Sequence, residues 1–152
     1  MSIWKAPITL EELNARNKGT MSDLLGICFT EIGDDYIKAT MPADARTFQP
    51  AGIIHGGANV TLAETVASIA ANFVIDNTRY RAVGQEINAN HIRPVSSGIV
   101  TATAKPLHLG KTSQVWHIEI VNEAGKLTCI SRMTAAIINL VGAQGSASCA
   151  AG

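Results

Sequence analysis

The segment Gln49–Ile75 begins Gln-Pro-Ala-Gly-Ile-Ile-His-Gly-Gly, then becomes almost wholly apolar, and it decides the fold of this chain. From Ala58 onward, the spacing of apolar residues predicts a helix with two apolar rows: Leu62, Val66, Ile69 and Phe73, and Ala63, Ala67, Ala70 and Val74. Because this helix is apolar nearly all round, we expect it to be buried. Gly56 and Gly57 allow a sharp turn before it, and we expect them to leave unpaired N–H groups that attract negative charge.

One acidic residue, Glu64, interrupts the apolar helix, and Ser68 follows one turn later on the same side. An ionised carboxylate is costly in apolar surroundings, so such a residue is usually paired, protonated or functional. The spacing alone leaves two interpretations open. Glu64 is either a working acid or a glutamate on the helix surface that faces solvent or a structural partner.

The separation between His55 and Glu64 favours a dimer. The two residues are nine positions apart in the sequence, which is roughly 13 Å along a helix at about 1.5 Å per residue. A single chain cannot easily close both side chains around one reacting atom. If both act on one substrate, an antiparallel copy of the helix from a second subunit would bring them together.

Size and composition limit the classes of function. A chain of 152 residues fits one domain, and its zero net charge gives no field to attract nucleic acid or an anionic membrane. Charged residues make up only 16%, which suggests surface buried in an oligomer, and the 5% aromatic content argues against a base-stacking platform. The three cysteines show no metal-ligand spacing, so neither a metal nor a cofactor is predicted. With no signal peptide and no membrane-spanning run in the sequence, we expect a cytoplasmic protein with reduced thiols.

The other elements follow from capping and alternation. Thr9 is placed to cap a short helix over 10–17 in a capping box with Glu12, and a brief helical turn should follow from Thr20 to Leu25. Strands are predicted at 27–32, 36–41, 82–92, 98–106, 113–121 and 127–140, with 107–111 as a connection or bulge. The order predicts an α+β fold in which an antiparallel sheet curls round the central helix. Residues 1–140 would form this single domain, and 141–152 a disordered tail.

The pattern Gln-Pro-x-Gly-x-x-His-Gly-Gly, then six residues, Glu64 and later Ser68, resembles the hotdog-fold acyl-CoA thioesterases with the acid on the central helix. Other stretches resemble, more narrowly, the small thioesterases of 1,4-dihydroxy-2-naphthoyl-CoA and the proofreading thioesterases of enterobactin synthesis. These stretches are Trp4, Gly33–Asp35, Ala39–Pro42, Asn88–Pro94, Pro106–Gly110 and Ser131–Arg132. The resemblance covers residues 3 to 140, and it implies that Glu64 is catalytic.

The resemblance also implies a mechanism. The Gly56 N–H and the Gln49 amide would polarise the thioester carbonyl, and Glu64 of the facing subunit would act as nucleophile or as general base. Ser68 would position Glu64 or the hydrolytic water, and His55 would lie near the sulfur. Simpler roles stay open: Gln49 could tie down its own loop, His55 could only cap the helix, and Ser68 could be a small residue in a buried helix.

The substrate-binding residues come from the same resemblance. His91 and Arg93 would line the channel for the pantetheine arm and phosphates of coenzyme A, although both could equally lie on a solvated strand edge. Gly57 and Ile69 are further substrate-binding positions. Ala51 stands where many close relatives carry a bulky aromatic residue, so the acyl pocket should be wider, or lack a stacking wall. A broader aryl- or medium-chain acyl-CoA substrate therefore fits as well as dihydroxynaphthoyl-CoA.

Three functions compete at this point. The first is hydrolysis of acyl-CoA, with acyl or aryl groups on a carrier protein as a possible second substrate. The second is a non-catalytic acyl-CoA-binding module, which would not need Glu64 buried beside a thioester. The third is a hotdog hydratase or dehydratase, but the sequence lacks the Asp and His pair of those enzymes. In each case we expect a homo-oligomer, at least a dimer, with a tetramer of two dimers implied by the resemblance.

Overall fold

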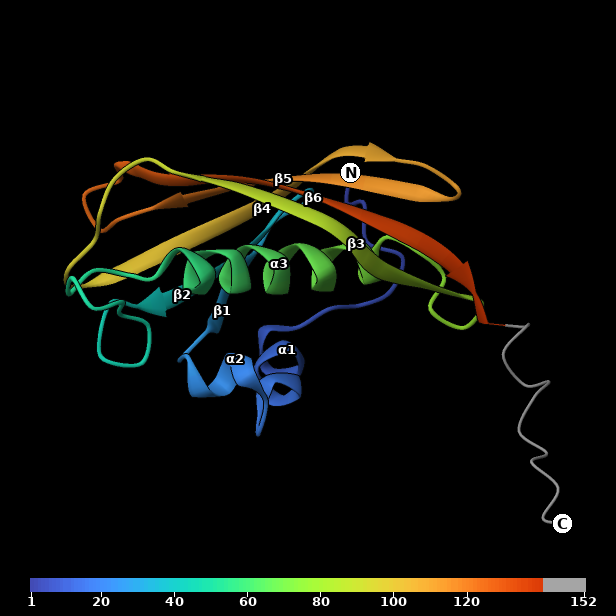
Figure 1. Cartoon of the computed structure of the whole chain (residues 1–152). Helices are drawn as coiled ribbons and strands as arrows, with labels where there is room; N and C mark the ends of the chain where they lie inside the picture. Colours follow the sequence, from blue (N-terminus) through green and yellow to red (C-terminus); the bar gives the residue numbers. More distant parts are fainter. Residues whose placement is uncertain (141–152) are drawn as a thin grey trace, which may run out of the picture.

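Six antiparallel strands form one curved sheet, and a long helix lies along it (Figure 1). The structure is a computed structural model that describes residues 1–140, so the predicted tail at 141–152 lies outside the described residues. In chain order the elements are α1 Leu10–Asn17, α2 Met21–Leu24, β1 Cys28–Ile32, β2 Ile37–Pro42, α3 Gly56–Phe73, β3 Tyr80–His91, β4 Ile99–Leu109, β5 Ser113–Val121 and β6 Leu127–Asn139.

The strand order is β1-β2-β4-β5-β6-β3, with every neighbouring pair antiparallel. The chain leaves β2, runs through α3 and enters β3 at the opposite edge of the sheet, so the helix crosses the sheet face between them. Figure 1 shows the sheet curving over α3, with α1 and α2 below the helix in that view. This arrangement confirms the predicted α+β fold, an antiparallel sheet around a central helix.

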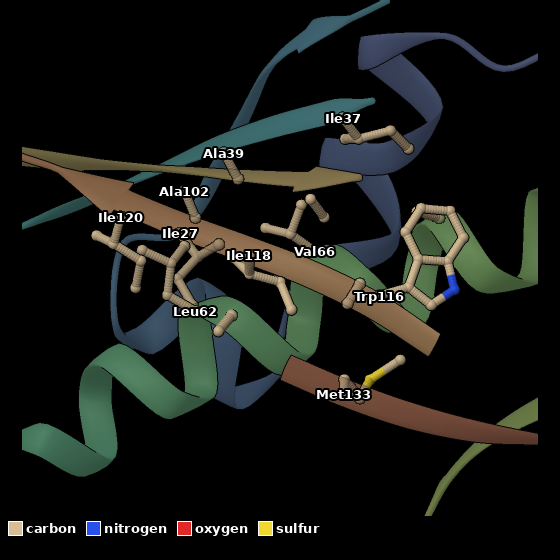
Figure 2. Close-up of a cluster of buried hydrophobic side chains, with 14 of the residues drawn as sticks. Ile27, Ile37, Ala39, Leu62, Val66, Ala102, Trp116, Ile118, Ile120 and Met133 are labelled. Carbon is tan, nitrogen blue, oxygen red and sulfur yellow. The ribbon is translucent and has the colours of Figure 1, made fainter. Parts of the chain in front are cut away.

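The core lies between α3 and the concave face of the sheet. On β5, Trp116, Ile118 and Ile120 alternate with more exposed residues and are fully buried, as their period-two spacing predicted. Leu62 and Val66 of α3 meet this face, and Figure 2 shows them beside these strand residues. Among residues 1–140, none of the helices combines the length and the apolarity needed to cross a membrane.

Two expectations need correction. Strand β4 does not end at Pro106 but continues to Leu109, with a register shift between Pro106 and His108, so of the two alternatives predicted for 107–111 the bulge is correct and the connection is not. Helix α3 is also not buried all round. Its sheet-facing side is buried, whereas Thr61, Glu64, Thr65 and Ser68 lie on a partly exposed stripe. The expectation failed because the sheet of this chain can cover only one side of the helix.

Replacing Leu62 with alanine should lower the free energy of unfolding by about 3 kcal/mol, because it leaves a cavity in a well-packed core. Leu62 is 0% exposed, whereas Leu24 of α2 is 74% exposed and provides a matched control. Denaturant unfolding of the two leucine-to-alanine variants measures the difference. Equal stability losses would show that α3 is not packed against the sheet as described.

Candidate active site

The segment before α3 is held in place by its own backbone. The Gln49 N–H donates to the Ile53 carbonyl at 2.9 Å, and the His55 N–H donates to the Thr47 carbonyl at 2.8 Å. Gly52, at φ +73°, forms the tight turn between them, in a region of backbone space that favours glycine. These bonds make a small hairpin-like loop that fixes Gln49 next to the start of the helix.

The start of α3 is closed by His55. Its Nδ1 accepts the Gly57 N–H at 2.8 Å, and its carbonyl accepts the N–H groups of Ala58 at 2.9 Å and Asn59 at 3.3 Å. The predicted capping role of His55 is therefore real, and the expectation that both glycines leave bare N–H groups is wrong for Gly57. In the described part of the chain, the Gly56 N–H is the one first-turn donor left without a partner.

A cavity of about 330 Å³ opens beside this free donor. Its polar lining comes from Gln49, Gly56, Asn59, His91 and Arg93, and isoleucine, proline and valine side chains form the rest. The His91 ring packs against Gly56, since a Cβ built on that glycine would lie only 2.7 Å from His91 Nε2. The structure thus brings Gln49, Gly56, His91 and Arg93 together around one cavity, and that they bind a substrate there stays a prediction.

The Gln49 side chain is bonded to its own loop through one of its two polar atoms. Its Oε1 accepts the Ala51 N–H at 2.8 Å, so the loop-tying interpretation of Gln49 is correct for that atom. No acceptor within residues 1–140 takes the Nε2 hydrogens, so they can donate to a bound ligand. Arg93, at the exposed end of the cavity, donates from Nη1 to the Leu127 carbonyl at 2.7 Å, which holds its guanidinium in place.

Glu64 lies in a different cavity, of about 280 Å³, which is lined by Met21, Thr61, Glu64, Thr65 and Ser68. The two cavities share no lining residue. The Ser68 hydroxyl donates to Met133 Sδ at 3.4 Å, and no hydrogen bond between Ser68 and Glu64 is present in residues 1–140. Within one chain, therefore, the acid and the Gly56 donor do not face the same space.

Three predicted substrate-binding residues lie outside both cavities. Ala51 and Gly57 are exposed, and Ile69 is partly buried against the core. Whether they contact a substrate stays a prediction. In residues 1–140, no group of three or more His, Cys, Asp and Glu side chains is arranged to hold a metal ion.

Sequence reasoning missed two residues beside these cavities. Asn59 lines the cavity at Gly56, and its polarity in an otherwise apolar stretch of helix was the signal that could have identified it. Gly84 of β3 lies against Glu64, because a Cβ built on it would be 3.0 Å from Glu64 Oε1. It adjoins a register shift between β3 and β6, which no local sequence signal announced.

The fold and the central helix define a class of protein, the hotdog fold, in which a curved antiparallel sheet wraps a long helix. The thioesterase superfamily model matches residues 51–129, a span that runs from the loop before α3 into β6. The chain belongs to the thioesterase superfamily.

Individual relatives agree with this assignment. The chain is 52% identical to the 1,4-dihydroxy-2-naphthoyl-CoA hydrolase of Escherichia coli over 90% of this chain and 99% of the relative. It is 49% identical to a proofreading thioesterase of Cronobacter sakazakii, over 90% and 98% of the two chains.

Two solved structures are similar over nearly their whole length. A mutant thioesterase from Pseudomonas aeruginosa superposes with a TM-score of 0.90 at 46% identity, over 91% of this chain and 100% of that one. A thioesterase from Haemophilus influenzae gives a TM-score of 0.90 at 47% identity, over 93% and 99%. These findings confirm the predicted fold and the predicted family resemblance, and they make this protein a thioester hydrolase.

Proposed function

We propose that this enzyme hydrolyses acyl-CoA thioesters to a free acid and coenzyme A, at a site completed by Glu64 of a second subunit. One observation carries the proposal. The unpaired Gly56 N–H and the Gln49 amide face one cavity, whereas Glu64 faces another. An acid and an oxyanion donor that serve one carbonyl must meet, and a second copy of the chain can bring them together.

Charge development on the thioester oxygen explains the two donors. The carbonyl oxygen would accept from the Gly56 N–H and from Gln49 Nε2, and both bonds strengthen as the oxygen becomes an oxyanion. The Gln49 amide is already fixed through Oε1, and the Gly56 N–H is fixed by the helix start, so neither donor has to reorganise during the reaction. The helix dipole of α3 adds to the stabilisation of negative charge at this position.

Glu64 would supply the attack on the carbonyl carbon, either directly as nucleophile or by taking a proton from water as general base. Ser68 lines the same cavity and would position Glu64 or the water. His55 lines neither cavity of a single chain, and its Nδ1 accepts the Gly57 N–H, so in this proposal its other ring nitrogen, Nε2, lies near the departing thiolate. A thiolate leaves readily, so a strong general acid is not needed.

The edge of the sheet supports a dimer. Strand β3 has twelve residues and lies at the end of the strand order, so one of its sides has no partner strand among residues 1–140. Long exposed edges are templates for pairing with another chain. Because Glu64 touches Gly84 on this strand, a subunit that docks at β3 would also lie close to Glu64.

The lining of the cavity beside Gly56 suggests where the coenzyme A part of the substrate would bind. His91 and Arg93 would line the path of the pantetheine arm, with the guanidinium towards the phosphates. We propose an aryl acyl group, since a relative at 52% identity is named for dihydroxynaphthoyl-CoA hydrolysis. Ala51 lines neither cavity of one chain, so its predicted widening of the acyl range requires that it borders the substrate in the assembled dimer. A carrier-protein thioester is a second candidate substrate, and a tetramer of two dimers is the proposed assembly. The two described cysteines, Cys28 and Cys129, are free, which supports a cytoplasmic enzyme.

The first test is thiol release from a panel of aryl- and alkyl-CoA thioesters, followed with a chromogenic disulfide. Turnover by the wild-type protein would support the proposal, and the best substrate would identify the acyl class. Binding of acyl-CoA without release of thiol would contradict it and favour a binding module.

A mixing experiment tests whether two subunits share the site. Glu64→Gln and Gly56→Pro should each be nearly inactive alone, because each lacks one half of every site. Assembled together in equal amounts, they should recover about one quarter of the wild-type activity, since half of the dimers are mixed and each of these has one intact site. The measurement is turnover of the best substrate after co-expression with two different affinity tags. Activity no greater than that of the separate variants would place the whole site within one subunit.

A further inference from the structure

Asn59 of α3 is a buried amide with an unpaired oxygen. The residue is only 7% exposed, yet it lines the cavity beside Gly56. Its Oδ1 is enclosed and has no hydrogen-bond partner among residues 1–140. A buried polar atom without a partner destabilises the folded protein by an amount comparable to a lost hydrogen bond, so most such atoms in proteins are paired.

The other polar groups of this cavity show which kind of ligand group Asn59 would accept. Gly56 presents a backbone N–H, Gln49 an amide N–H and Arg93 a guanidinium, and all three are donors. They suit the acceptors of an acyl-CoA, which are the thioester carbonyl and the phosphates. The Asn59 oxygen is an acceptor, so it requires a donor from the ligand, and the arm of an acyl-CoA offers N–H groups.

The position of Asn59 selects one of these N–H groups. Asn59 is three residues beyond Gly56, about 4.5 Å along the helix axis, and side chains on a helix lean towards its N-terminus. The amide therefore lies close to the place where the thioester carbonyl would bind. In the thiol arm, the nearest N–H is that of the cysteamine amide, two methylene groups from the sulfur.

We propose that Asn59 is a substrate-binding residue whose side-chain oxygen accepts a hydrogen bond from the cysteamine amide N–H of the bound thioester. The χ2 torsion of asparagine is broad, so in this proposal the amide oxygen turns towards the cavity when the ligand binds. Asn59 would then hold the arm while Gly56 and Gln49 hold the carbonyl. The inference rests on the proposed function, because it assumes that the thioester lies in this cavity.

A pair of substrates that differ in one N–H tests the assignment. The two are S-benzoyl-N-acetylcysteamine and the S-benzoyl thioester of 2-mercaptoethyl acetate, in which an ester oxygen replaces the amide N–H. Wild-type protein should show a kcat/KM roughly tenfold higher for the amide, the effect of about one neutral hydrogen bond. In Asn59→Leu, which keeps the size but not the acceptor, the ratio should fall to about one. Where turnover is slow, inhibition of benzoyl-CoA hydrolysis by the same compounds yields the ratio.

The melting temperature of the variants distinguishes a substrate-binding role of Asn59 from a structural role. Since leucine removes an unpaired buried polar atom, Asn59→Leu should melt at or above the wild-type temperature. Asn72 of the same helix is the matched control. Its amide donates to the Ser68 and Ala82 carbonyls and accepts the Ala82 N–H, all at 3.0 Å, so Asn72→Leu should melt lower.

Each outcome decides between defined alternatives. A wild-type ratio near one would overturn the assignment and leave a buried water as the partner of Asn59. A tenfold wild-type ratio that persists in Asn59→Leu would also overturn it and assign the N–H to another group. If wild-type protein hydrolyses neither these thioesters nor benzoyl-CoA, and neither compound inhibits, the proposed hydrolysis of aryl-CoA fails and the assignment fails with it.

Discussion

Replacing Glu64 with glutamine should lower kcat by roughly 10²–10⁴-fold on the best acyl-CoA, the usual contribution of a positioned acid or base. The substitution preserves the size of the side chain and its place beside Gly84, but removes the carboxylate that attacks or takes a proton. Glutamine is neutral, and because Glu64 is only partly buried, solvent can reach the new amide group. The variant should therefore fold and assemble normally. Thiol release at saturating substrate, with size-exclusion chromatography on the same samples, measures both.

Glu119→Gln is the control for loss of a carboxylate elsewhere. Glu119 lies on β5 with a side chain that is 55% exposed and a His117 neighbour at 3.2 Å, remote in the sequence from both cavities. This variant should retain wild-type turnover. Retained activity in Glu64→Gln would show that Glu64 is not a catalytic residue. In an active wild type, turnover in heavy-oxygen water tests the nucleophile role. Label on Glu64 requires a mixed anhydride that water attacks at the Glu64 carbonyl, because a general base keeps both of its oxygens.

Replacing Gly56 with proline should lower kcat/KM by about 10²–10³-fold relative to Gly56→Ala, the effect of removing one oxyanion donor. Proline is well suited to the first position of a helix, where its missing N–H disrupts no helical bond. His55 before it is extended, at φ −63° and ψ 136°, as a residue preceding proline should be. The substitution therefore removes the free N–H with little change to the backbone.

Gly56→Ala controls for the added side chain. Alanine keeps the N–H, but its Cβ meets His91 Nε2 as the proline Cβ does, so any loss common to both variants comes from displacement of His91. Steady-state kinetics on one substrate compares the two, and circular dichroism confirms that α3 forms in both. Equal activities would mean that the Gly56 N–H does not bind the thioester oxygen.

The elements of this fold could be predicted because their signals are local. The apolar repeat of α3, the alternation on β5 and the Thr9 cap of α1 each depend on residues within a few positions of one another. Thr9 Oγ1 accepts the Glu12 N–H at 3.2 Å, as its spacing predicted. The bulge in β4 was less clear, because Pro106 suggested the end of a strand that the neighbouring β5 in fact continues to pair.

The candidate site likewise combines features that local sequence predicted with features that only the structure shows. The residue types and spacing of Gln49, His55, Gly56 and Glu64 already predicted a loop, a helix start and an acid on that helix. Their catalytic roles came from the family resemblance and stay a proposal. The structure corrected the expectation that both glycines at the helix start have free N–H groups. His55 Nδ1 accepts the Gly57 N–H, so of the two only the Gly56 N–H is free among the described residues. A side-chain rotamer decided that point, and spacing does not specify rotamers.

The sequence by itself therefore determined the central helix, the α+β class and the residue types from which the chemistry is built, since each depends on short-range periodicity or capping. Only the tertiary structure placed Glu64 and Gly56 in separate cavities, set Gly84 against Glu64 and left the Asn59 oxygen enclosed without a partner. Those features depend on how a sheet built from distant segments packs on the helix. Contacts between residues far apart in the chain decide them, and a local pattern does not contain that information.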